Sequence, residues 1–450
     1  MSFFASDENL LEKGNIIMNK NRGILMPIAS LPNVCGVGDF GGSAYAFVDL
    51  LVKAKFNYWQ ILPLNPIGFG HSPYQSTSSF AFDEIYISLE DLKNRNLISN
   101  FEIVNQSDKS DFEQARKIKE KAIEEAFANF SKDGSNLEKL NKFLKQNKRI
   151  KEYAFYITLR DLNDKKQWNM WKITEISMQN ATFLKHAFAQ MILFEEWKKI
   201  RKFANKNGVQ IIGDIPFYVG YDSSDVYFNK SSFLLDKKYN PTAVAGVPPD
   251  YFSKNGQRWG NPIWNWDYLE KHDFGVMMER LAFASKLYDI TRIDHFRAFD
   301  SYWAINPKCK TAKDGKWKYP NGYGFFNRLF EKYPDINIIV EDLGDLRDEV
   351  LQLRDHFNLA GMRNEQFTIF DDELNGKRVE KFNQLYCSGT HDNETILEWS
   401  EKLDSQIKNS VNNQKNNEEI FVPGSCCYSC LVRSVRRWCW YQYEHCWQGW

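Results

Sequence analysis

Short apolar runs recur along the chain, and each ends at a polar or acidic residue. Such runs, when helical stretches separate them, predict parallel strands joined by crossover helices, which is the α/β class. Seven of them favour a (β/α)8 TIM barrel over an open sheet, and no convincing eighth strand follows, so we expect the eighth strand to be missing. The seven runs are Gly23–Leu31, Phe56–Pro63, Val209–Asp214, Ile290–Asp294, Ile336–Glu341, Arg363–Phe367 and Leu385–Asp392.

Two stretches are too long to be simple crossovers. Residues 83–180 are charged and helix-prone, which predicts an inserted helical subdomain. Residues 220–275 are rich in Pro, Gly, Trp and Tyr, which predicts loops over the site. The predicted organisation is an N-terminal extension over residues 1–22, a catalytic barrel over 23–416 with these two insertions, and a separate tail over 417–450.

Composition and charge narrow the class of partner. The chain has 450 residues with 58 basic and 58 acidic side chains, so its formal net charge is +0. A nucleic-acid or acidic-membrane partner usually requires a basic excess, so neither partner is expected. No signal peptide is recognisable in Met1–Lys20 and no apolar run has the length of a membrane span, so the predicted location is cytoplasmic. We expect Cys35, Cys309 and Cys387 to be reduced thiols.

Four acids each close an apolar run: Asp214, Asp294, Glu341 and Asp392. A parallel barrel brings the carboxyl ends of its strands together at the face where catalysis occurs. Retaining glycoside chemistry needs two carboxyl groups about 5–5.5 Å apart, one ionised and one protonated. The alternative is that such acids cap loops or pair with arginines, and for any single acid the two interpretations are about equally favoured.

The local context of these acids supports the catalytic interpretation. Asp294 lies between Arg292 and Arg297, and neighbouring cations lower the pKa of a carboxyl group and keep it ionised. Glu341 follows three apolar residues, a setting that raises a carboxyl pKa and leaves a proton to donate. His391 alone would more often be a buried structural histidine, but it stands beside an acid at a strand end, where it is suited to bind sugar hydroxyls.

These segments resemble the amylomaltase family, a branch of the α-amylase clan. The likeness runs in order from Gly23 to Asn393, and eight motifs in one order are difficult to obtain by chance. They are GILMPIASLPNVCGVGDFG (23–41), WQILPL (59–64), SPYQSTSSFA (72–81), IIGDIPFYV (211–219), VPPDYFSKNGQRWGNPIWNW (247–266), RIDHFRAF (292–299), EDLG (341–344) and GTHDN (389–393).

The resemblance implies roles for the acids and their neighbours. Asp294 matches the nucleophile and Glu341 the general acid/base. Asp392 matches the third acid, which holds the ring hydroxyls and favours the distorted transition state. Arg292 and His391 match contacts to the −1 sugar.

The resemblance also implies a surrounding set of substrate-binding residues. Asp214 matches a supporting acid, and Tyr74 and Ser72 lie in a loop that lines the site. Gln257 and Trp259 match a mobile loop that covers the bound glucan. For Trp259 the alternative is a packed loop tryptophan.

The function implied is that of a 4-α-glucanotransferase. Such an enzyme transfers α-1,4-glucan segments to the 4-hydroxyl of glucose or maltodextrin acceptors by a retaining double displacement. We expect no metal and no organic cofactor, since no Gly-rich phosphate loop follows a strand. Two alternatives remain: a hydrolase of the α-amylase clan with water as acceptor, and an inactive glucan-binding protein if an incomplete barrel cannot catalyse.

The C-terminal tail departs from the family pattern. The resemblance ends near Asn416, before the family's eighth strand, and Cys426–Trp450 is a run rich in Cys, Trp, Arg and Tyr. Its cysteines and His445 lack the clean second ligand pair of a zinc site. A shifted reading frame explains the change in composition better. A barrel without its last strand leaves two unpaired edges, so we expect this chain to be poorly soluble and nearly inactive.

Overall fold

A computed structural model describes residues 21–68, 72–104, 109–250, 253–364, 366–367 and 383–402. The chain divides into two compact units, residues 1–362 and 363–450, which are described separately. Nearly all of the predicted N-terminal extension and the whole of the predicted tail lie outside the described residues. The predictions about them therefore stay predictions.

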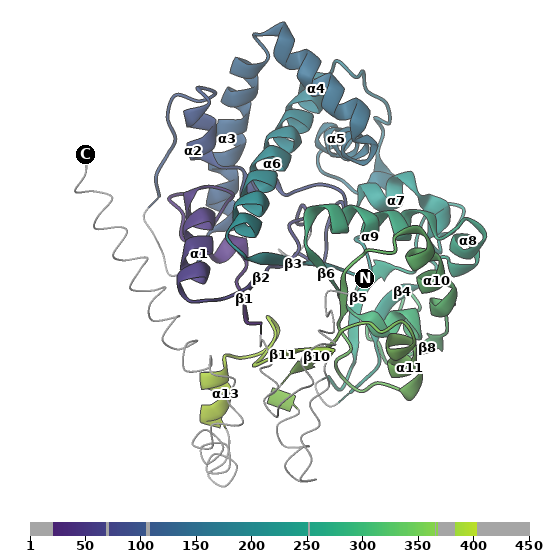
Figure 1. Ribbon diagram of the computed structural model, residues 1–450. Coiled ribbons are helices and arrows are strands. Elements are labelled where there is room, and N and C mark those ends of the chain that lie inside the picture. Colours follow the sequence, from purple (N-terminus) through teal and green to yellow (C-terminus); the bar gives the residue numbers. More distant parts are fainter. Residues whose placement is uncertain are drawn as a thin grey trace. The chain divides into compact units, whose positions relative to one another are not determined.

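The centre of the first unit is a parallel sheet (Figure 1). Among the described residues it has five strands in the order β1-β2-β3-β6-β9, so each strand lies beside the next one in chain order. This succession is the one that a barrel requires. The strands are β1 (Gly23–Leu25), β2 (Tyr58–Gln60), β3 (Gln210–Ile215), β6 (Ile290–Ile293) and β9 (Ile338–Val340). Each lies within a run predicted from sequence, except that β3 extends one residue past its run.

Helices form the crossovers between these strands. The helix α1 (Gly42–Lys53) links β1 to β2, and it buries Phe47 and Leu51 among other apolar residues of one face. The Phe47 ring lies 5.1 Å from the ring of Trp59 in β2, whose indole N–H donates to the Met26 carbonyl. The helices α9 (Gly275–Leu287) and α10 (Gly322–Lys332) precede β6 and β9 in the same way.

Helices also occupy much of the stretch between residues 83 and 206. In Figure 1 they gather on one side of β2 and β3. Their buried faces are mostly apolar but include polar residues such as Gln190 and Glu196 of α6, and Lys119 of α3 forms a buried ion pair with Asp39. They are η3 (Glu84–Tyr86), α2 (Leu89–Asn94), α3 (Phe112–Phe130), α4 (Gly134–Gln146), α5 (Lys148–Leu162), η4 (Trp168–Met170) and α6 (Ala181–Lys206).

A second, antiparallel sheet stands where loops were expected. The strands β4 (Val244–Val247) and β5 (Gln257–Pro262) pair with each other, and β4 also pairs with β7 (Tyr302–Ile305), which pairs with β8 (Gly315–Lys318). The short helices α7 (Ser224–Phe228), η5 (Lys230–Ser232) and α8 (Trp266–Lys271) complete this stretch. Its turn-forming residues favoured loops, but β4 is stabilised by β7, a partner almost 60 residues away that no local pattern reveals.

The remaining elements complete the two units. The first unit also holds η1 (Ile28–Ser30), η6 (Phe296–Phe299) and α11 (Asp348–His356). The strand β10 (Gly361–Asn364) crosses the boundary and forms a two-stranded sheet with β11 (Gln384–Cys387). The second unit also holds α13 (Ile396–Lys402). None of the helices in the described residues is long and apolar enough to cross a membrane.

Candidate active site

The carboxyl ends of β3, β6 and β9 place charged side chains next to one another. The register pairs Asp214 with Arg292 and Ile293 with Val340. The ladder continues one residue past the strands, because the Asp294 N–H donates to the Ile215 carbonyl (3.1 Å) and the Glu341 N–H donates to the Ile293 carbonyl (2.9 Å). Asp294 and Glu341 therefore leave neighbouring strands at the same level.

One guanidinium joins two of these acids. The Nη1 atom of Arg292 lies 2.8 Å from both carboxylate oxygens of Asp214 and 3.1 Å from Oδ1 of Asp294. Burial alone would lower the pKa of Arg292, but the charges of Asp214 and Asp294 outweigh it and raise that pKa well above its ordinary value. The Arg292 and Asp214 side chains are buried, whereas the side chain of Asp294 is 26% exposed. Asp294 is thus the acid of this group that is open to a ligand.

Arg297 does not have the position that the sequence pattern predicted. Its Nη1 donates to the Asp345 carbonyl (3.0 Å), and its guanidinium lies 4.6 Å from the centre of the Trp317 ring. Strand alternation ends at Ile293, and the chain turns at His295 before Arg297 is reached in η6. Arg292 is therefore the guanidinium with a described ion pair to Asp294.

Glu341 has a different environment from Asp294. Its Oε2 atom accepts a hydrogen bond from the backbone N–H of His295 (2.7 Å). Loss of solvation and the nearby charge of Asp294 raise the pKa of Glu341 to about 8, against the opposing effects of Arg292 and of the His295 N–H. Glu341 therefore keeps its proton at neutral pH.

Tyr74 reaches the same group of residues from the loop after β2. Its hydroxyl donates to Oδ2 of Asp214 (2.7 Å), and burial together with the Asp214 charge raises the pKa of Tyr74 far above its ordinary range. The Ser72 hydroxyl accepts the Tyr74 backbone N–H (3.3 Å), so Ser72 shapes the turn that presents the tyrosine.

The predicted covering loop includes β5. The Trp259 indole N–H donates to the side-chain oxygen of Gln257 (3.1 Å), and the Trp259 ring lies edge-to-face with His295, 4.8 Å between centroids. The side-chain amides of Gln75 and Asn261 bond to each other at 2.9 and 3.3 Å. Trp259 therefore contacts His295, the residue that directly follows Asp294 at the end of β6.

Sequence reasoning did not single out His295, Gln75 or Asn261. Their signal was present but indirect, because all three stand inside the motifs that carry the family resemblance: RIDHFRAF, SPYQSTSSFA and the segment 247–266. Nothing in the pattern shows that His295 adopts a left-handed backbone conformation (φ 53°, ψ 48°).

Asp392 and His391 belong to the second unit. The His391 Nε2 lies 3.4 Å from Asp392 Oδ2, and the Asp392 side chain is 79% exposed. The turn that carries them is held by Asn393, whose side-chain oxygen accepts from the Thr390 N–H and hydroxyl, both at 2.9 Å, and from Asn364 Nδ2 at 2.6 Å. These contacts describe the second unit alone, so the roles assigned to Asp392 and His391 stay predictions.

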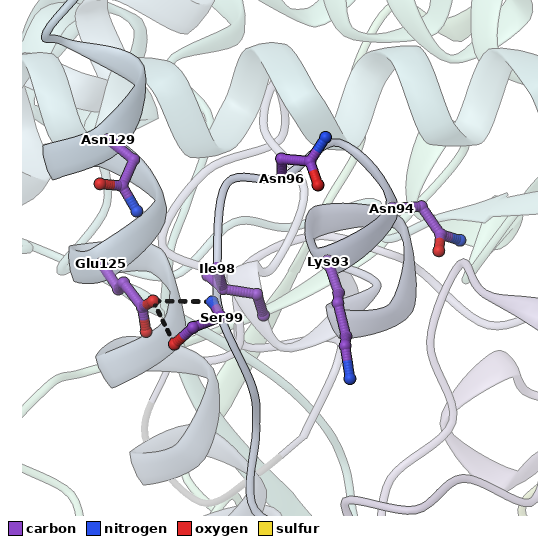
Figure 2. Close-up of a pocket in the computed structure, with 7 residues that line it drawn as sticks. All are labelled: Lys93, Asn94, Asn96, Ile98, Ser99, Glu125 and Asn129. Atoms are coloured by element: carbon purple, nitrogen blue, oxygen red, sulfur yellow. Dashed lines mark hydrogen bonds between the residues drawn. The ribbon is translucent and has the colours of Figure 1, made fainter.

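No group of three or more His, Cys, Asp or Glu side chains among the described residues is arranged to hold a metal ion. A surface hollow of about 590 Å³ lies apart from the strand ends, between α2 and α3 (Figure 2). Two of its polar lining residues hydrogen-bond to each other, because Glu125 accepts from both the N–H and the hydroxyl of Ser99 (2.8 and 2.9 Å). The lining residues are Lys93, Asn94, Asn96, Ile98, Ser99, Glu125 and Asn129.

Comparison with known proteins gives consistent results. A family model described as 4-alpha-glucanotransferase matches residues 26–445, a span that continues past the point near residue 416 where the motif resemblance ends. A 4-alpha-glucanotransferase of Clostridium butyricum is 40% identical over 402 residues, which cover 85% of this chain and 82% of that protein. One of Streptococcus pneumoniae is 38% identical over 404 residues, covering 84% and 79%. The solved structure of an amylomaltase from Streptococcus agalactiae in complex with acarbose has a TM-score of 0.83 and 34% identity, covering 90% of this chain and 85% of that one.

Proposed function

The chain belongs to the 4-alpha-glucanotransferase family, and on that premise we propose that Asp294 and Glu341 divide the chemistry of the transfer between them. The family, the barrel fold and the transferase activity predicted from sequence are confirmed. The substrates are α-1,4-glucans and maltodextrins. The roles of individual residues are our proposal.

In the first half of the reaction, Asp294 attacks the anomeric carbon of the donor glucan. The bond from that carbon to the leaving 4-oxygen breaks, and Glu341 gives its proton to that oxygen. The product is a glucosyl group joined to Asp294 by a β-linked ester. In the second half, Glu341 takes the proton from the 4-hydroxyl of an acceptor, the acceptor oxygen attacks the same carbon, and Asp294 leaves as a carboxylate.

One observation carries this assignment. The partly exposed Asp294 has its carboxylate at 3.1 Å from Arg292, whereas the pKa of Glu341 is raised to about 8. A nucleophile must be ionised and a general acid must hold a proton, and here the environments separate the two groups in that sense. Tyr74 and Asp214 complete the arrangement by fixing Arg292 from its other side.

We assign the sugar contacts to a wider set of residues. Arg292 and His391 contact the −1 sugar, Asp392 binds its ring hydroxyls, and Gln257 and Trp259 cover the bound glucan. Gln257 and the side chain of Asp392 are exposed, so both are open to a ligand, which supports the roles proposed for these two residues.

Substitution of the two carboxyl groups tests the assignment. We expect Asp294→Asn and Glu341→Gln each to reduce transfer from maltotriose by several orders of magnitude, about 10³-fold or more. The matched control is Asp289→Asn, at the other end of the same strand, where Asp289 accepts the Ile211 N–H and pairs with Arg201. This control should lose stability but keep turnover per folded molecule. Near-normal turnover in either carboxyl variant would refute the assignment.

Trapping of the intermediate identifies the nucleophile directly. A 5-fluoro-α-glucosyl fluoride forms the glycosyl-enzyme faster than acceptors remove it, and peptide mapping by mass spectrometry then locates the label. We expect the label on the peptide that contains Asp294. A label on the peptide that contains Asp214 or Asp392 would contradict the proposal.

Product analysis separates transfer from hydrolysis. With maltotriose as the only substrate, we expect release of glucose and a ladder of longer maltodextrins, resolved by anion-exchange chromatography. If the products are only shorter sugars, and reducing ends rise steadily, the hydrolase interpretation is correct. Amylose binding without turnover would support the glucan-binding alternative.

We also propose a cytoplasmic location. Cys35 and Cys309 are free thiols, which fits a reducing compartment. Fractionation of the source cells, with the activity assayed in each fraction, tests this. Activity in the secreted fraction would contradict it.

A further inference from the structure

His295 directly follows the proposed nucleophile and has an unusual backbone conformation. Its φ of 53° and ψ of 48° place it in the left-handed region, which most side chains with a Cβ disfavour and which glycine, asparagine, aspartate and histidine enter more readily. A strained conformation of this kind persists only where surrounding contacts determine it, and such residues cluster at functional sites.

The left-handed turn directs two consecutive backbone N–H groups at Glu341. The His295 N–H donates to the Oε2 atom of Glu341 at 2.7 Å. The next residue, Phe296, donates its N–H to the Glu341 backbone carbonyl at 3.1 Å. Side chain and main chain of the proposed acid/base are thus held from the same turn.

The imidazole ring is positioned by aromatic packing. Its centroid lies 4.8 Å from the Trp259 ring and 6.3 Å from the Tyr218 ring, and the Tyr218 side chain is buried. Burial and the charge of Arg297 lower the pKa of His295 to about 3, so the ring is neutral at working pH. The ring therefore acts through packing and not through charge.

We propose that His295 is a positioning residue for Glu341: its ring, packed against Trp259 and Tyr218, fixes the left-handed turn that aims its backbone N–H at the Glu341 carboxyl group. The proposal rests on the assignment of Glu341 as acid/base. On this proposal the segment around Trp259 both covers the bound glucan and, through its contact with His295, helps to hold the Glu341 carboxyl group in place.

The hydrogen bond has a predictable effect on proton transfer. An N–H donor stabilises the ionised form of a carboxyl group and lowers its pKa. If the turn relaxes and the N–H moves away, the pKa of Glu341 rises and the side chain loses its fixed orientation. The alkaline limb of kcat/KM should then move to higher pH, while kcat falls and KM changes little.

Three substitutions separate the backbone effect from the ring. His295→Ala, His295→Asn and His295→Gly all remove the imidazole, but asparagine and glycine tolerate the left-handed turn and alanine disfavours it. We expect His295→Ala to lose the most in kcat with maltotriose, and His295→Asn and His295→Gly to exceed it by about five- to thirtyfold. The alkaline limb should move to higher pH in His295→Ala and remain near the wild-type position in the other two.

A donor that needs no protonation tests whether the loss acts through Glu341. Fluoride leaves without a general acid, so the burst of fluoride from α-maltotriosyl fluoride in the first turnover should be nearly unchanged in His295→Ala. The control is Lys55→Ala, because exposed Lys55 has a similar left-handed conformation (φ 59°) far along the chain from the strand ends. This control should leave both donors and the pH profile unchanged.

Several results would overturn the proposal. Equal loss in the three His295 variants would mean that only the ring matters, and no loss in any would mean that neither feature matters. An equal loss with both donors in His295→Ala would show general damage to the site. If instead the assignment of Glu341 as acid/base is wrong, Glu341→Gln will keep normal turnover with maltotriose. That result does not depend on the His295 variants, so the two failures can be told apart.

Discussion

Replacing Glu341 by glutamine should stabilise the folded protein, and the gain should increase with pH. Glutamine has the same shape and can still accept the His295 N–H, but it carries no charge. The pKa of Glu341 is raised from 4.5 to about 8 on folding, chiefly by loss of solvation and by Asp294. The folded state therefore binds this proton more tightly than the unfolded state does.

The sign and the size of the effect follow from this shift. A raised pKa contributes stability that is fully present below pH 4.5 and is lost as pH rises toward 8. Each tenfold change in the proton equilibrium corresponds to about 1.36 kcal/mol. Relative to the glutamine variant, wild type should be less stable by about 1 kcal/mol at pH 5.5, about 3 kcal/mol at pH 7 and up to about 5 kcal/mol at pH 9.

Urea unfolding of both proteins between pH 5.5 and 9 measures the difference. The control is Glu138→Gln, an exposed glutamate in α4, whose free energy of unfolding should follow wild type throughout. A difference between Glu341→Gln and wild type that does not change with pH would refute the reasoning. It would mean that Glu341 titrates in the folded protein as it does in the unfolded chain.

Other substitutions test neighbouring parts of the site. Gly213→Ala places a Cβ 2.1 Å from the Tyr288 ring and should reduce the free energy of unfolding by about 2–3 kcal/mol. Urea titration should show a smaller loss from Gly213→Ala when Tyr288→Ala is also present. Arg292→Lys cannot match the guanidinium geometry and should reduce kcat with maltotriose about 100-fold; a loss below threefold would contradict the geometry. Arg280→Met removes the guanidinium that donates to the Pro216 carbonyl and one of the two side-chain donors to the Phe217 carbonyl, the other being the Trp264 indole N–H, and should destabilise the fold by about 3 kcal/mol; an unchanged urea midpoint would exclude this role. EDTA treatment should leave turnover unchanged, and a loss restored by a divalent ion would contradict this.

The sequence predicted where three acids lie, at the ends of strands, because strand and acid are adjacent in the chain. Asp214, Asp294 and Glu341 each stand at or directly after an apolar run, and parallel pairing then brings them to one edge of the sheet. Only the strand succession and the side-chain type are needed for this step. Both are local properties of the sequence.

Features that depend on distant partners were not predicted. The strand β4 forms against β7, so residues 220–275 resembled loops until their partner was known. Arg297 was expected beside Asp294 because it flanks that acid in the motif, but the chain turns at His295 and Arg297 donates to the Asp345 carbonyl instead.

The roles that we propose for the two carboxyl groups are explained by the position of one guanidinium. Three acids, Asp214, Asp294 and Glu341, surround the single charge of Arg292, and retaining all three negative charges in a poorly solvated site is unfavourable. Asp214 has both oxygens on Arg292 and accepts the Tyr74 hydroxyl, and Asp294 lies 3.1 Å from Arg292 and is partly exposed. Glu341 accepts a backbone N–H, and no guanidinium of the described residues is hydrogen-bonded to it. Protonation of Glu341 therefore reduces the repulsion among the three carboxylates the most. The acid/base role that we propose for Glu341 therefore depends on where Arg292 lies.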